Sequence, residues 1–172
     1  MINKKLMALA VFFLLLSIGS HMYIEAHPAP VEPSGYTFEE LMGEMQARSE
    51  GEILYNLDSK SAESSVVSLY GWAFMEGHST EFTNTVIGLQ DEAENLRVFT
   101  TEKVARTDVS AAFDDSLYEG SGFSANCDMN GLPAGNYTLI LYLTDAEENV
   151  YYHLNLPITV VFDGVNAVYA DE

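Results

Sequence analysis

The sequence contains a single cysteine, Cys127, so no disulfide bond can form within the chain. A domain without such cross-links must be stabilised by the packing of its core. Cys127 falls in an apolar, strand-like stretch, which predicts a buried structural thiol. A disulfide bond between two chains is the alternative.

Basic residues are also scarce. Lys and Arg number 7 against 26 Asp and Glu, which gives a formal net charge of −19. A chain this acidic repels phosphate backbones and anionic lipid, so nucleic acid is excluded as a partner. The charge is typical of a solubilising surface, and it also allows attraction to cations or to a basic polymer.

Recognisable catalytic and metal-binding motifs are missing. The sequence has no G-x-S-x-G nucleophile elbow and no glycine-rich phosphate loop. Its histidines lack the spacing of a zinc site; they are His21, His27, His78 and His153. Paired carboxylates of a glycan hydrolase remain an alternative, but no particular pair is favoured. We therefore predict no catalytic residue, no cofactor and no metal ligand.

Residues 1–26 have the pattern of an export signal. Lys4 and Lys5 precede an unbroken apolar run over residues 6–16. Cleavage after Ala26 would release a secreted protein. Without cleavage, an apolar stretch extended to residue 24 reaches the ~20 residues of a spanning helix and forms a membrane anchor. In both cases the rest of the chain is expected to be extracytoplasmic.

The segments that follow differ in character. Residues 27–36 include three prolines and predict a semi-rigid spacer. Residues 37–50 predict a short amphipathic helix, from about Phe38 to Arg48, with Thr37 and Glu40 forming a capping box. Residues 51–163 predict a β-sandwich domain, and residues 164–172 a tail.

The strand prediction rests on alternating apolar residues. Over residues 151–162 every second residue, from Tyr152 to Phe162, is apolar, which is typical of an antiparallel sheet with one buried face. Pro157 within this stretch indicates a sheet edge or a bulge. About five to seven short strands are expected in all. Residues 106–120 are expected to form a helical turn that crosses from one sheet to the other.

Two acidic turns raise a calcium alternative. They comprise Asp91, Glu92 and Glu94, and Asp145, Glu147 and Glu148. Oxygen ligands in turns can converge on Ca²⁺. A calcium-stabilised adhesion domain is therefore a further hypothesis, although neither turn has EF-hand spacing.

An ordered set of short motifs resembles the immunoglobulin-like β-sandwich modules of bacterial envelope and surface-polysaccharide-associated membrane proteins. The motifs are Leu57-Asp58-Ser59, Gly71-Trp72-Ala73-Phe74, Arg106-Thr107-Asp108-Val109, Ser121-Gly122-Phe123 and Leu132-Pro133-Ala134-Gly135-Asn136-Tyr137. The resemblance implies a non-catalytic accessory or adhesion domain and transfers no binding residue.

Three residues of these motifs also have physical interpretations. Trp72 is expected to fill the core between the sheets. Tyr137 is placed as the tyrosine corner of such folds. Arg106 is expected to pair with Asp108 or with a carboxylate at residue 114 or 115.

Together these observations predict an exported, non-catalytic binding or scaffolding module at the bacterial cell envelope. Its expected partner is an envelope protein or a cell-surface glycan. Contact with the membrane is expected only through residues 1–26, if they are retained.

Overall fold

The computed structural model describes residues 33–49 and 51–170. The predicted export signal and residues 27–32 of the predicted spacer lie outside this part of the chain. Within it, no helix has the length and apolar character needed to cross a membrane.

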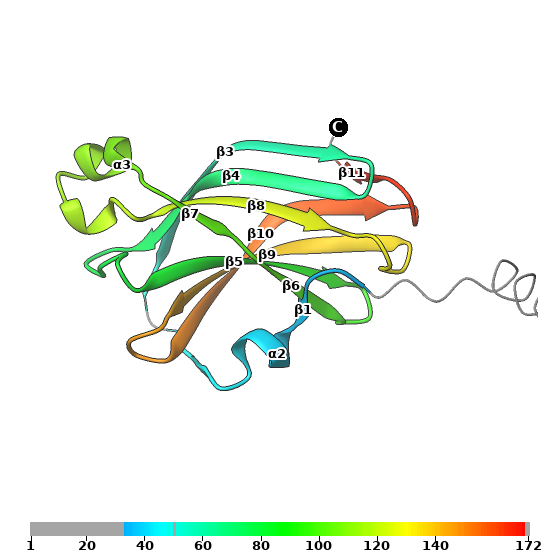
Figure 1. Cartoon of the computed structure of the whole chain (residues 1–172), viewed down its shortest axis with the longest axis horizontal. Coiled ribbons are helices and arrows are strands. Elements are labelled where there is room, and N and C mark those ends of the chain that lie inside the picture. The colour runs from blue at the N-terminus through cyan, green and yellow to red at the C-terminus, as the bar shows by residue number, and fades with distance from the viewer. Residues whose placement is uncertain (1–32, 50, 171–172) are drawn as a thin grey trace, which may run out of the picture. The chain divides into compact units, whose positions relative to one another are not determined.

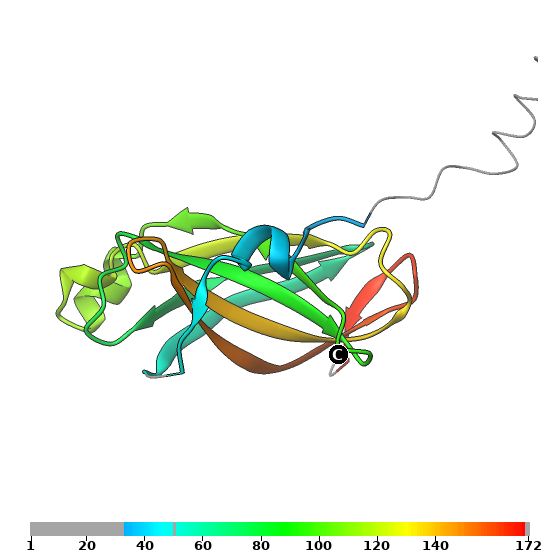
Figure 2. The same cartoon turned by 90° about the horizontal axis from the view of Figure 1, so that it is seen from below.

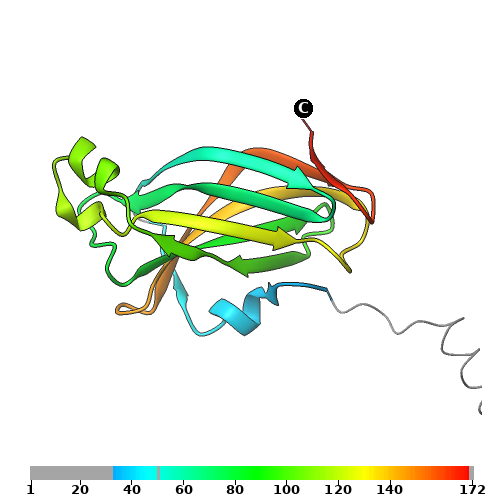
Figure 3. The ribbon, with the colours of Figure 1, turned by 45° about the horizontal axis from the view of Figure 1, so that its top comes forward.

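Two β-sheets face each other across one core (Figures 1 and 3), which confirms the expectation of a mainly β fold. Along the seven-stranded sheet lie β1 (Tyr36–Thr37), β6 (Leu96–Thr100), β5 (Thr83–Asp91), β9 (Gly135–Asp145), β10 (Val150–Phe162) and β11 (Ala167–Tyr169), with β2 (Gln46–Ala47) paired to β10. The four-stranded sheet has the order β3 (Ile53–Glu63), β4 (Val66–Met75), β8 (Gly122–Asp128) and β7 (Glu102–Val104).

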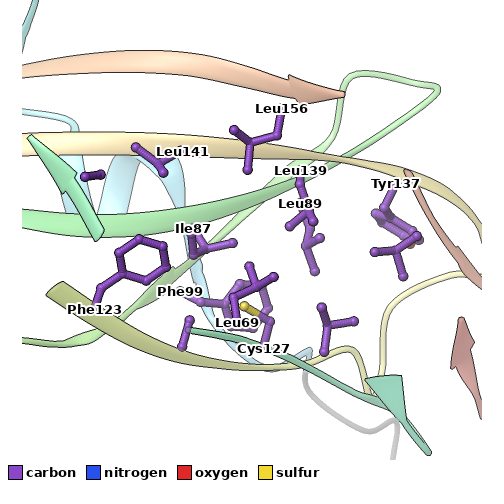
Figure 4. Packing of buried hydrophobic residues seen from close by; sticks show 14 of the residues in the cluster. Leu69, Ile87, Leu89, Phe99, Phe123, Cys127, Tyr137, Leu139, Leu141 and Leu156 are labelled. Carbon is purple, nitrogen blue, oxygen red and sulfur yellow. The ribbon is translucent and has the colours of Figure 1, made fainter. Parts of the chain in front are cut away.

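The core between the sheets is formed by the alternate side chains of both sheets. Figure 4 shows Ile87 and Leu89 of β5 near Leu69 of β4 and Cys127 of β8. Burial raises the pKa of the Cys127 thiol to about 12, and its exposed fraction is 0%. The prediction of a buried structural thiol is confirmed.

The predicted amphipathic helix is present but shorter than expected. The helix α2 spans Phe38–Met42 and begins with the expected capping box between Thr37 and Glu40. It ends at Gly43, and two of the residues that follow pair with β10 as β2. Figure 2 shows α2 against the outer face of the seven-stranded sheet, where its apolar side chains cover Tyr142.

The strand β10 contains a register shift and pairs with an additional short strand near the C-terminus. Its pairing with β9 shifts register between Asn155 and Thr159, which confirms the bulge expected at Pro157. The predicted tail contains β11, which pairs with β10 and buries Ala167 and Tyr169. The prediction of a tail is therefore wrong over residues 167–169. Three residues are too few for an alternating sequence pattern to predict a strand.

The helical segment after β7 does not connect the two sheets. It consists of α3 (Thr107–Ala112) and a 3-10 helix, η1 (Ser116–Tyr118), and it leads from β7 to β8 within the four-stranded sheet. The chain changes sheets earlier, at the single residue Thr101 between β6 and β7.

Candidate ligand-binding face

The outer face of the four-stranded sheet carries a row of aromatic side chains from β4. Side chains alternate along a strand, and Gly71 and Ala73 take positions that face the core. Tyr70, Trp72 and Phe74 therefore project outward, and the rings of Trp72 and Phe74 stack 5.5 Å apart. The expectation that Trp72 fills the core is wrong, because its small neighbours hold the core positions.

A helical cover closes one end of this row. The Tyr118 ring of η1 stacks on Phe74 with centroids 3.9 Å apart, and Phe74 is buried. Phe113, at the end of α3, meets Trp72 edge-on at 5.9 Å. On the part of this face that Tyr118 leaves uncovered, Tyr70 is 37% exposed, Phe113 is 44% exposed and Trp72 is half-buried. We call the three side chains of Tyr70, Trp72 and Phe113 the aromatic shelf.

Arg106 lies beside the shelf and is held by two carboxylates. Its Nε and Nη2 donate to the two oxygens of Asp108 at 2.8 and 2.7 Å, and its Nη1 donates to Asp58 at 2.5 Å. The guanidinium carbon lies 5.9 Å from the Tyr70 ring centroid. The predicted pairing with Asp108 is confirmed. The Asp58 contact was missed because 48 residues separate the partners.

This network fixes the charges around the shelf. The hydrogen bonds from Arg106 lower the pKa of Asp108 to about 2, so its carboxylate stays ionised. The same bonds raise the pKa of Arg106 above its ordinary value. Gly122 makes room for the arginine stem, because a Cβ there would lie 2.6 Å from Cγ of Arg106. With 9% of its surface exposed, Arg106 is a buried anchor rather than a mobile surface cation.

Polar side chains border the shelf on the same face. Asn56 donates its amide N–H to Asp58 at 2.7 Å, and the Ser68 hydroxyl donates to Asn126 at 2.7 Å. Tyr70 stands between Ser59 of β3 and Ser124 of β8 in the strand register. The face therefore offers exposed ring surfaces next to hydrogen-bond donors and acceptors.

A cavity of about 550 Å³ lies elsewhere, between β3 and β10. It is lined by Arg48, Ser49, Gly51, Glu52, Ile53, Tyr55, Tyr152, His153, Leu154 and Asn155. Among the residues that the structure describes, Glu52 is the one carboxylate in this lining. A glycan hydrolase needs two carboxylates across the scissile bond, and the described part of this lining supplies one.

A second, more open depression of about 470 Å³ contains two carboxylates, those of Glu81 and Glu119. Both residues are exposed. The general acid of a glycosidase needs a site shielded from water, and this depression does not provide one. Instead, the Lys103 ammonium beside it donates to the backbone oxygens of residues 80, 81 and 83, which ties the β4–β5 loop to β7.

The acidic turns are organised by their own backbone. Asp91 accepts hydrogen bonds from the N–H groups of Ala93 and Asn95, and Asp145 accepts from those of Glu147 and Glu148. Over residues 33–49 and 51–170, no three side chains of the metal-ligating types converge. The carboxylates of Asp91 and Asp145 thus stabilise their turns, an arrangement that does not favour the calcium hypothesis.

Two other residues lie where the sequence predicts. The Tyr137 hydroxyl donates to the Pro133 carbonyl at 2.6 Å, as in a tyrosine corner. His153 is exposed on the polar side of β10.

Asp58 belongs to one of the recognised motifs and lies at an irregularity of β3, since the pairing with β4 shifts register between Leu57 and Ser59.

No protein-family model matches the chain, and no curated protein is significantly similar to it. The assignment of function therefore rests on the residues of the site.

Proposed function

We propose that this chain is an exported, non-catalytic binding module of the bacterial cell envelope. It would have an immunoglobulin-like sandwich fold and bind a cell-surface glycan through the aromatic shelf. The export pattern of residues 1–26 supports the location. The packed sheets and the hydrogen bond from Tyr137 to Pro133 support the fold type.

The aromatic shelf is the observation that carries the proposal. Tyr70 and Trp72 project from β4; Phe113 at the end of α3 meets Trp72 edge-on, and the buried Arg106 lies beside the Tyr70 ring. Rings held in this way lose little conformational freedom on binding. Pyranose rings present C–H faces that pack on aromatic surfaces, while their hydroxyls can hydrogen-bond to Asn56 and Asp58.

A glycan fits this face better than the insertion of a protein side chain. Protein hot spots are well-packed pockets filled by an anchor residue. None of the cavities that we describe is lined by a residue of the shelf. An exposed aromatic surface with polar groups at its border suits a chain of sugar rings.

A glycan array probed with the full chain, kept in mild detergent because of its apolar N-terminal run, tests the proposal. We expect retention on envelope glycans and about tenfold weaker binding after Tyr70→Ala, which corresponds to about 1.4 kcal/mol. Phe82→Ala is the matched control, because Phe82 is a 46% exposed aromatic residue outside the shelf. No retention on any glycan, or equal losses in the two variants, would overturn the proposal.

A further inference from the structure

The strand register of the four-stranded sheet places its two lysines at positions that face the core and not at positions on the outer face. Lys60 of β3 pairs with Leu69, and Lys103 of β7 pairs with Phe123; both partners face the core. The Lys60 ammonium lies 4.0 Å above the ring of Tyr169. The Lys103 ammonium donates to backbone carbonyls of the β4–β5 loop, and partial burial lowers its pKa.

Carboxylates occupy the positions that point outward. Glu102 of β7 pairs with Ser124 beside Tyr70, so it shares the face of the shelf. At the other end of the sheet, Glu63 and Asp128 flank Val66 on the same face. Within the described residues of the four strands, both lysines therefore occupy core-facing positions, while these three carboxylates face outward.

The cation at the border of the shelf does not reverse this charge. Arg106 is shared between Asp58 and Asp108, so the three groups together carry a net negative charge. The side chain of Asp108 is 67% exposed and remains ionised, because the hydrogen bonds from Arg106 lower its pKa to about 2. A ligand that reaches the shelf meets aromatic faces bordered by the carboxylates of Asp58, Asp108 and Glu102, and Glu63 and Asp128 lie farther along the same face of the sheet.

From this distribution we propose that the shelf selects a cationic glycan, one whose sugars carry free amino groups; the inference rests on the proposed function. An ammonium group is attracted both to the exposed ring faces and to the surrounding carboxylates. The sugar rings supply the stacking surface, and their amines supply the opposite charge. Acetylation of those amines would remove their positive charge, and with it the attraction of the ammonium groups to the carboxylates and to the ring faces. The stacking of the sugar rings on the aromatic side chains would remain.

The test compares three probes on the full chain in mild detergent, at about pH 5.5, where sugar amines are protonated and the carboxylates are ionised. The probes are a β-linked glucosamine oligosaccharide, its fully N-acetylated counterpart and an oligolysine of equal charge. Affinity is measured by calorimetry at about 50 and about 500 mM NaCl. We expect the free-amine oligosaccharide to bind about tenfold more tightly than the acetylated one at low salt, and the difference to shrink at high salt.

Charge variants locate the effect on this face. Glu63→Gln and Glu102→Gln together should weaken binding of the free-amine probe by about fivefold and leave the acetylated probe unchanged. Glu94→Gln and Glu147→Gln together, a change of equal charge in the two exposed acidic turns, should have no effect. Equal losses in the turn variant and the face variant would show only long-range attraction by the whole acidic chain and would overturn the inference.

The outcomes separate this inference from the proposed function. If both oligosaccharides bind equally and Tyr70→Ala weakens both, glycan binding stands and the cationic selection is overturned. If only oligolysine binds, both proposals are overturned and the face belongs to a basic peptide. If none of the probes binds here and no glycan is retained on the array, both proposals are likewise overturned.

Discussion

Replacement of Gly71 by alanine tests the close packing of β3 against β4 beneath the shelf. A Cβ at this position would lie 2.2 Å from the carbonyl oxygen of Asn56 and 3.2 Å from Cα of Leu57. Relief requires a backbone shift of about 1 Å, because the obstructing atoms belong to the main chain and not to a flexible side chain. The shift would fall beside the register irregularity of β3, between Leu57 and Ser59.

We expect Gly71→Ala to lower the free energy of unfolding by about 3 kcal/mol, at the upper end of overpacking costs. For a domain of this size, the loss lowers the thermal midpoint by about 10 °C. Urea unfolding followed by the fluorescence of Trp72 measures the change directly. Because Gly71 lies between Tyr70 and Trp72, glycan binding should weaken in the same variant.

Gly135→Ala is the matched control, since a Cβ at Gly135, the first residue of β9, would have no heavy atom within 4 Å. We expect a change within about 0.5 kcal/mol of zero, with slight stabilisation through loss of unfolded-state entropy. Stabilities of the two variants within about 0.5 kcal/mol of each other would refute the argument that backbone contact requires glycine at position 71.

Further variants test the ion-pair network, the helix cap and the thiol. Arg106→Met should destabilise the fold by about 2 kcal/mol, because it removes the buried guanidinium that joins the partly buried Asp58 to Asp108, whereas Arg97→Met, at a less buried site, should cost under about 1 kcal/mol. In the native chain the pKa of Asp108, about 2, lies below its ordinary 3.8. The contribution of this group to stability is therefore complete above about pH 4 and is lost as the pH falls towards 2, and acid titration of Arg106→Met should lack that loss. Thr37→Ala should cost about 1 kcal/mol in chemical unfolding. Cys127 should react with a thiol reagent only in denaturant, because its pKa is raised to about 12 by burial; rapid reaction of the folded chain would contradict this expectation.

The sequence predicted features that depend on neighbouring residues. The capping box at Thr37, the bulge at Pro157 and the corner hydrogen bond of Tyr137 each involve partners within a few positions along the chain. The alternation of apolar and polar residues in β10 also predicted which face of that strand is buried. Such local patterns predict both the element and the orientation of its side chains.

Long-range pairing explains the errors. Trp72 belongs to an apolar run in which both sides of the strand are covered, one by the core and the other partly by α3, so alternation could not tell which side faces the second sheet. The strand β2 and the contact between Arg106 and Asp58 depend on partners far along the chain. The aromatic shelf was therefore not predictable as a site, although Trp72 lies within one of the recognised motifs and Tyr70 and Phe113 lie a few residues from others.

The order of the first elements has a mechanical consequence. Residues 33–47 attach to the body through a two-residue pairing of β1 with β6, the packing of α2 and a two-residue pairing of β2 with β10. If the chain is held at its N-terminus while the shelf grips a polymer, tension reaches these short attachments before it loads the long ladders of β3 with β4 or β9 with β10. Their release would add up to about 50 Å of chain and detach β1 and β2, while the longer strands of both sheets stay paired. Under a pulling force the N-terminal segment would then extend while the ligand stays bound, and it would pair with the sheet again when the force subsides.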